Sequence, residues 1–286
     1  MRRLAGAVVL PDSGRDDLGD TIASVHAYLP EATVVVVDDR PEPASKRSFG
    51  PGCVVLPPLP YPRNAYGGLW MKECYAFRWA LSNLDLDLDY VLRLDSDALL
   101  LGPGLDVLVA ERFAAEPRLG VLGSYRLGQE GGTRDFGPAA RAVRSEAGLP
   151  GLVLRPTCRA ALRELLSAAR ANGYEFGEHT LGAVNALRPE MLARCHEKGW
   201  LGMEALAGSR LGEDWLVSLV ARAAGYSIGE LGGPGGPLAL AWKGLPEAPE
   251  ALVEKGVLAT HSVRFWRERS EVEIRSYFAE KRGGSR

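Results

Sequence analysis

Tyr90-Val-Leu-Arg-Leu-Asp-Ser-Asp-Ala-Leu-Leu-Leu101 decides the fold class, because it joins an apolar strand to a pair of carboxylates. The run from Tyr90 to Leu94 predicts a buried strand, and Asp95 and Asp97 follow it one residue apart. In extended backbone, side chains two residues apart point to the same side. Two oxygen ligands then converge at a strand end, as Mg²⁺ or Mn²⁺ requires. An ordinary acidic turn is the other explanation of this triplet taken alone.

The composition limits the class of protein. The 286 residues are 46% hydrophobic and 24% charged, as in globular chains with a sizeable core. A net charge of −2 without a long basic run argues against a nucleic-acid partner. Four distant cysteines without a Cys-x-x-Cys pair predict reduced thiols in a cytoplasmic protein, and the Ala, Gly and Arg content suggests a bacterial one. No apolar stretch approaches the roughly 18 residues of a transmembrane helix.

Strand and helix signals alternate through the first half of the chain. The predicted elements are strands at 4–10, 33–37, 53–56 and 90–94 and helices at 16–29 and 69–84. This order predicts an α/β fold with a mainly parallel central sheet flanked by helices, Rossmann-like in its alternation. Ligands of such sheets bind beyond the carboxyl ends of the strands. Three stretches at such ends are therefore expected to meet in one crevice: Pro11-Asp12, Asp38-Asp39 and Asp95-Ser96-Asp97.

The second half is less regular. Strands are predicted at 121–125, 152–155, 179–187 and 238–242, and helices at 157–172, 189–198 and 215–224. The Gly-rich segments 126–150 and 229–237 are predicted to be loops, and either could close as a lid. No internal repeat and no convincing linker interrupts the chain.

Taken together, these motifs resemble those of GT-A fold glycosyltransferases, which use nucleotide-sugar donors. The resemblance runs from Leu4 to about Arg264 and rests on five motifs that come in the family's order. The first three are a strand ending at Pro11-Asp12, Val34-Val-Val-Val-Asp-Asp39 and Asp95-Ser-Asp97. The last two are Leu211-Gly-Glu-Asp-Trp-Leu216, with the helix and strand that follow it to Leu231, and Thr260-His-Ser262. It implies a single domain over 1–286, with a nucleotide-sugar-binding half at 1–101 and an acceptor-binding half at 102–286.

The resemblance also implies roles for the acidic motifs. Asp95, Asp97 and His261 are expected to bind Mn²⁺ or Mg²⁺, which would neutralise the diphosphate leaving group. Asp214 is expected to be the general base that takes a proton from the acceptor hydroxyl, and Glu213 would hold the acceptor or exchange roles with it. A Gly-Glu-Asp sequence is also an ordinary helix start, which is the structural alternative for this pair.

Further side chains are expected to bind the two substrates. For the donor, a UDP-sugar by this resemblance, they are Pro11, Asp12, Asp38, Asp39, Arg63, Lys72, Asp95 and Ser96. For the hydroxyl acceptor they are Trp215, Trp242 and Lys243, since tryptophan faces often stack on sugar rings.

The leading prediction is thus a metal-dependent hexosyltransferase that inverts the sugar, and three alternatives stay open. Trp70-Met-Lys72 with the helix that follows it also resembles retaining enzymes of the same fold, whereas the Glu-Asp pair favours inversion. A sugar-phosphate nucleotidyltransferase would need a Gly-rich, basic loop after its first strand, but Pro11 to Asp17 is acidic and has one glycine. A non-catalytic binding domain would be expected to have lost some of the acidic motif residues.

Overall fold

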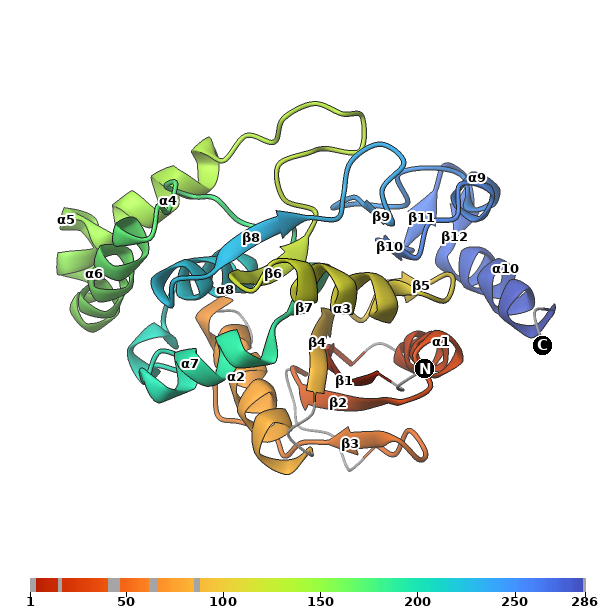
Figure 1. Ribbon diagram of the computed structural model, residues 1–286, viewed down its shortest axis with the longest axis horizontal. Coiled ribbons are helices and arrows are strands. Elements are labelled where there is room, and N and C mark those ends of the chain that lie inside the picture. The colour runs from red at the N-terminus through yellow and green to blue at the C-terminus, as the bar shows by residue number, and fades with distance from the viewer. Residues whose placement is uncertain (1–3, 15–16, 41–46, 62–65, 85–87, 285–286) are drawn as a thin grey trace.

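The computed structural model describes residues 4–14, 17–40, 47–61, 66–84 and 88–284. Its centre is a seven-stranded sheet in the order β3-β2-β1-β4-β7-β6-β8 (Figure 1). The strands are β1 (Ala5–Asp12), β2 (Ala32–Asp38), β3 (Cys53–Val55), β4 (Leu88–Leu94), β6 (Leu119–Gly123), β7 (Val184–Leu187) and β8 (Ser227–Glu230). Strands β3, β2, β1 and β4 pair in parallel, as do β6 and β8, and β7 runs antiparallel to both its neighbours. The predicted α/β fold with a mainly parallel sheet is confirmed.

Helices cover both faces of this sheet. The helices are α1 (Leu18–Tyr28), α2 (Tyr66–Asn83), α3 (Leu105–Ala115), α4 (Gly137–Ala147), α5 (Leu149–Leu154), α6 (Pro156–Ala171), α7 (Pro189–Glu197), η1 (Glu204–Leu206), α8 (Glu213–Ala223), α9 (Pro249–Glu254) and α10 (Glu271–Gly284). Val9 and Val35 pack in one core with α2, α6, α7 and α8, whereas Val8 and Val34 pack in another with α1 and α3. Successive side chains of a strand point to opposite faces, so the valine run of β2 is buried on both sides as predicted.

A small second sheet brings the end of the chain to the end of β4. It consists of β5 (Leu99–Leu100), β10 (Ala259–His261) and β9 (Leu238–Leu240). Strand β10 pairs antiparallel with β5, so that Thr260 lies opposite Leu99. His261 is therefore held beside the turn that carries Asp95 and Asp97. A two-stranded ribbon of β11 (Phe265–Trp266) and β12 (Arg269–Ser270) follows before α10.

Two predictions for the second half were wrong. Segment 126–150, predicted as a loop, contains α4, whose buried Ala139, Ala140 and Val143 face the core despite the many glycines around them. Segment 152–155, predicted as a strand, forms the end of α5, because a short apolar run fits a helical turn as well as a strand. The strand predicted at 179–187 is confined to its last four residues, β7. Within the described residues, no helix has the length and apolar content that crossing a membrane requires.

Candidate active site

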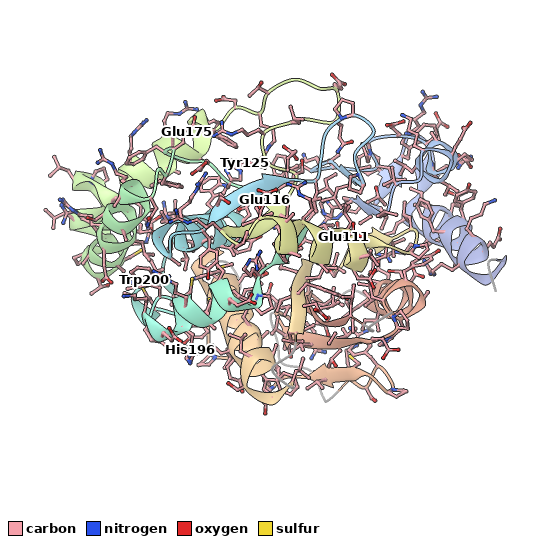
Figure 2. All side chains as sticks on the ribbon, in the orientation of Figure 1. Glu111, Glu116, Tyr125, Glu175, His196 and Trp200 are labelled. Carbon is pink, nitrogen blue, oxygen red and sulfur yellow. The ribbon has the colours of Figure 1, made fainter. Side chains whose placement is uncertain are left out.

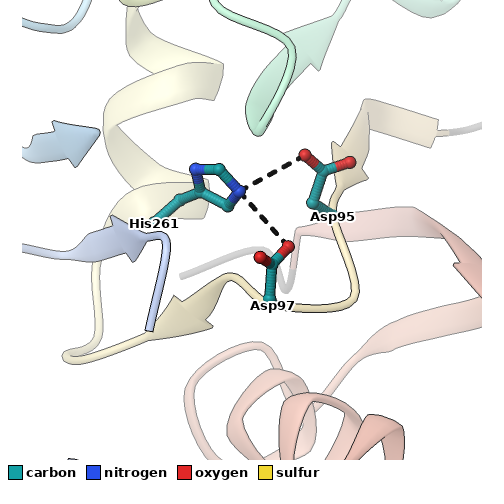
Figure 3. Close-up of side chains that lie close together, drawn as sticks. All are labelled: Asp95, Asp97 and His261. Atoms are coloured by element: carbon teal, nitrogen blue, oxygen red, sulfur yellow. Dashed lines mark ion pairs between the residues drawn. The ribbon is translucent and has the colours of Figure 1, made fainter. Parts of the chain in front are cut away.

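Two carboxylates and one imidazole converge where β4 and β10 end (Figure 3). His261 Nε2 lies 3.2 Å from Asp97 Oδ1 and 3.5 Å from Asp95 Oδ2. The other ring nitrogen, Nδ1, lies 2.8 Å from the carbonyl oxygen of Ala241 and therefore carries the donated proton. When Nε2 is protonated it donates to these carboxylates, and when that proton is lost its lone pair points to the same position, as in a metal-ligating histidine.

Arginine side chains hold the remaining carboxylate oxygens. Arg93 lies 2.8 Å from Asp95 Oδ1, and Arg264 lies 2.6 Å from Asp97 Oδ2. The Ser262 hydroxyl also donates to Asp97 Oδ2, at 2.9 Å. Each carboxylate thus has one oxygen that no arginine holds, and both of these oxygens face the imidazole. Two hard oxygens and a nitrogen within 4.8 Å of one another fit a divalent cation such as Mn²⁺ or Mg²⁺.

The charges of this cluster shift the pKa values of its members. Burial alone would raise the pKa of Asp97, but its hydrogen bond with His261 and the charges of His261 and Arg264 hold it well below the usual range. Burial alone would lower the pKa of His261, but the same hydrogen bond and the charges of both aspartates raise it. Asp97 is therefore ionised at neutral pH, as a metal ligand must be.

Arg93 connects this cluster to the first turn of α8. Its guanidinium is buried in β4 and lies 2.9 Å from Glu73 Oε1 of α2 and 3.0 Å from Glu213 Oε1 of α8. It also donates to the carbonyl oxygen of Gly182. Burial raises the pKa of Glu73 to about 8, against the opposing charge of Arg93, so this carboxyl is largely protonated at pH 7. Asp95 and Glu213 are then the anions that the guanidinium balances.

Glu213 and Asp214 open α8, as predicted. Asp214 Oδ1 accepts a hydrogen bond of 2.9 Å from the backbone N–H of Trp215. Burial, followed by the charge of Glu213, raises the pKa of Asp214 well above its ordinary value, and burial also raises the pKa of Glu213. A carboxylate with a raised pKa is better suited to accept a proton than an ordinary one.

His179 lies beside Asp214 as a neutral ring. Its Nδ1 is 2.7 Å from the carbonyl oxygen of Gly177, and its Nε2 is 2.9 Å from the guanidinium of Arg134. Nδ1 therefore donates, and Nε2 accepts from Arg134. Burial lowers the pKa of His179 to about 4. The 4.0 Å approach of Nε2 to Asp214 Oδ2 is consequently no ion pair at neutral pH.

A pocket of about 310 Å³ joins the two groups of acidic residues. Its lining residues come from the first residue of α2, the ends of β9 and β10, the start of α8 and the loops between elements: Tyr66, Asp95, Leu181, Gly182, Ala183, Arg210, Gly212, Glu213, Asp214, Trp215, Leu240, Ala241, Trp242 and His261. The structure thus brings six of the predicted site residues to one cavity. Trp242 is 82% exposed at its edge, and Lys243 lies 5.3 Å from the centroid of its ring.

Most of the predicted donor residues lie at the neighbouring strand ends and are not among these lining residues. Asp12 and Asp38 are register partners at the ends of β1 and β2. Arg40 Nε lies 2.9 Å from Asp38 Oδ1 and 3.8 Å from Asp12 Oδ2. Lys72 Nζ donates to Asp39 Oδ1 at 2.8 Å, and both residues are buried. At these strand ends the aspartates therefore already form ion pairs with basic side chains.

Three further predicted residues have different surroundings. Pro11 is buried beside Asp12 in β1. Ser96 lies between Asp95 and Asp97, and its hydroxyl is 3.3 Å from that of Ser13. Arg63 lies outside the described residues.

Sequence reasoning missed Arg93, Arg264 and the His179–Arg134 pair. The sequence contained a signal for Arg93. This residue stands two positions before Asp95 in an otherwise apolar strand, so the two side chains point to the same face of the sheet. A charged residue in a buried strand normally has a charged partner. The other three come from loops whose contacts depend on the tertiary fold.

Comparisons with known proteins found similar solved structures and nothing else. No family model and no curated protein matches the chain. A solved structure of the galactosyltransferase LgtC with donor and acceptor sugar analogs is similar over 98% of this chain and 96% of its own, at 12% identity and a TM-score of 0.47. An active-site mutant of LgtC is similar over 99% and 96% of the two chains, with the same identity and TM-score.

Over nearly its whole length, the chain is similar to LgtC. At 12% identity and a TM-score below 0.5 this likeness supports no conclusion about function, and what the pocket can do follows from its own side chains.

Proposed function

We propose that this chain is a metal-dependent glycosyltransferase that moves a sugar from a nucleotide-sugar donor, foremost a UDP-sugar, to a hydroxyl acceptor. One observation carries the proposal: Asp95 and His261 line the same pocket as Glu213 and Asp214. Transfer from a diphosphate requires positive charge for the leaving group and a base for the incoming hydroxyl. One cavity of this chain offers the residues for both.

Asp95, Asp97 and His261 would hold the divalent cation through the atoms that face one another. When bound, the cation supplies charge compensation for the departing diphosphate. Arg93 and Arg264 keep the carboxylates turned toward that position, because each holds the oxygen on the far side. The other end of the donor would lie over the ends of β1 and β2, where Asp12 and Asp38 can accept hydrogen bonds from ribose hydroxyls.

Asp214 would act on the acceptor. Its Oδ2 takes the proton of the acceptor hydroxyl while that oxygen forms the new bond to the anomeric carbon and the bond from this carbon to the diphosphate breaks. Neutral His179 beside it does not compete for the carboxylate as a cation would. Glu213 is held by Arg93, which fits a role in positioning better than one in proton transfer. Trp215 and Trp242 on the pocket wall offer ring faces to a sugar.

This arrangement favours inversion, since a base on the acceptor side is what a single displacement needs. Retention is the alternative. The anomeric configuration of the product, read by NMR once an acceptor is found, separates the two.

The proposal is tested by thermal unfolding with UDP, GDP and dTDP, each with and without Mn²⁺. A ligand at about 100 times its dissociation constant stabilises the folded state by roughly 2.7 kcal/mol. We expect one nucleotide to raise the Tm, only when Mn²⁺ is present, and Asp97→Asn to abolish the shift. No metal-dependent shift with any of the three would contradict the donor site.

Glu111→Gln is the matched control. It also removes one carboxylate, but Glu111 is exposed on α3 and is not among the lining residues of the pocket (Figure 2). It should keep the full shift. Equal losses in both variants would mean that net charge, and not the cluster, governs binding.

A further inference from the structure

Helix α5 exposes a cluster of apolar side chains at one end of the molecule. Leu149, Val153 and Leu154 are 76%, 81% and 69% exposed, and Leu152 is 46% exposed. Helices α4, α5 and α6 together form one extremity of the long axis, opposite the C-terminal helix α10 (Figure 1). Exposed leucines and valines are common singly, but four within six residues form a contiguous patch of the kind that marks an interaction site.

The helices around this patch are strongly basic. Residues 137–171 contain six arginines and two glutamates, which gives the segment a charge of +4 in a chain whose net charge is −2. One of these glutamates, Glu146, is buried and accepts hydrogen bonds from the Cys158 thiol and the backbone N–H of Arg210. Glu164 is then the one exposed carboxylate of this segment.

These arginines are not neutralised within the protein. Among the described residues, none of the six makes an ion pair with a carboxylate, although buried and half-buried arginines elsewhere, such as Arg93 and Arg222, do. The six are Arg141, Arg144, Arg155, Arg159, Arg163 and Arg170. Their charge is therefore available to an external anion.

Three of them surround one surface pocket. Arg144, Arg163 and Arg170 line a hollow of about 380 Å³ together with Ser167 and Phe176, and none of its described lining residues is acidic. The guanidinium carbons of Arg144 and Arg170 lie 5.0 Å and 5.6 Å from the centroid of the Phe176 ring. Stacking on the ring fixes two of the cations without using their hydrogen-bond donors, which stay free for phosphate oxygens.

We propose that this end of the molecule docks on an anionic phospholipid bilayer. Leu149, Leu152, Val153 and Leu154 enter the acyl region, and the arginines contact lipid phosphates. A bilayer fits both features at once, because its anionic surface attracts each basic residue by about 1 kcal/mol and its interior takes protruding apolar side chains. A protein partner would have to offer an apolar face ringed by acids to the same end.

The docked surface would adjoin the candidate active site. A second hollow beside α5 is lined by Gly151, Leu154, Arg155 and Arg210, and Arg210 also lines the active-site pocket. The bilayer would thus lie on the side of the molecule where this pocket begins. Docking itself does not depend on the proposed glycosyl transfer, and its test uses no activity.

The test is flotation of the full chain with vesicles of pure phosphatidylcholine and with vesicles that contain phosphatidylglycerol. We expect binding to the anionic vesicles alone, weakened by salt. Val153→Ser with Leu154→Ser should reduce binding at least tenfold, whereas Val272→Ser, at a residue 74% exposed on α10, should leave it unchanged. Absence of flotation with anionic vesicles would overturn the proposal.

Charge reversal tests the arginines in the same assay. Arg144→Glu, Arg163→Glu and Arg170→Glu together should abolish flotation, and reversal of the exposed Arg118, Arg194 and Lys198 should not. Equal losses of flotation in both triple variants would overturn the proposal, because net charge and not this surface would then govern vesicle binding. Complete release by millimolar inorganic phosphate at constant ionic strength would also overturn it, because the pocket would then be a site for a soluble anion.

Discussion

Replacing Arg93 by methionine should be the most destabilising single change at the candidate active site. The guanidinium is almost fully buried and lies within 3.0 Å of the carboxyl groups of Glu73, Asp95 and Glu213. Methionine fills much of the volume but leaves Asp95 and Glu213 without their cation. Breaking a buried ion pair from one side costs about 3–5 kcal/mol, a large part of the roughly 5–15 kcal/mol that stabilises a folded protein.

Urea unfolding followed by tryptophan fluorescence measures this cost. Arg112→Met is the matched control, because Arg112 pairs with Glu116 across one helical turn and both side chains are partly exposed, at 35% and 51%. That substitution should cost only about 0.3–0.5 kcal/mol. Arg93→Lys should fall between the two, since it keeps the charge but loses the planar fork that reaches several carboxylates.

The pH dependence separates an electrostatic cause from a packing defect. In Arg93→Met the unpaired carboxylates can bind protons, so the loss relative to wild type should shrink as pH falls from 8 to 5. A loss below 1 kcal/mol at pH 8, or one that does not change with pH, would refute the reasoning.

Three further predictions concern other residues. Burial raises the pKa of Asp214 above its ordinary value of 3.8, so that at any pH above 3.8 the ionisation of this group favours the unfolded chain. Asp214→Asn should therefore raise the Tm at pH 8. A series of Tm measurements over pH should show this gain vanish near pH 4. Gly177→Ala should cost more than Gly173→Ala in urea unfolding: both glycines have positive φ, which costs about 1–2 kcal/mol for alanine, but only at Gly177 would the new Cβ lie 2.4 Å from a backbone nitrogen, that of Ala140. Trp242→Ala should change the unfolding free energy by less than about 0.5 kcal/mol, because the ring is exposed, yet raise the KM for a sugar acceptor once one is known.

Patterns with a strong period gave most of the fold in advance. The valine run of β2 and the apolar spacing of α2 and α6 each allow one reading, so these elements lie close to where they were predicted. The predictions for 126–150 and 152–155 were wrong because glycine content and short apolar runs are ambiguous. Tertiary packing decided there, burying Val143 of α4 and leaving Val153 of α5 exposed.

The sequence predicted individual residues of the site, but not the contacts that bring them together. Asp95, Asp97 and His261 meet because β10 pairs with β5, a contact between segments about 160 residues apart that no local pattern encodes. The arginine cluster around Phe176 was missed for the same reason, since its members come from α4, α6 and the loop after α6. The division of 1–286 into donor and acceptor halves stays a prediction.

Titration of the protein with Mn²⁺, followed by the electron paramagnetic resonance signal of the free ion, tests the central claim most directly. The titration is repeated with saturating UDP, GDP or dTDP, and on Asp97→Asn and Glu111→Gln. We expect one bound ion per chain, lost in Asp97→Asn and kept in Glu111→Gln. Mn²⁺ that stays free in the presence of every nucleotide, or that binds equally well to Asp97→Asn, would contradict it.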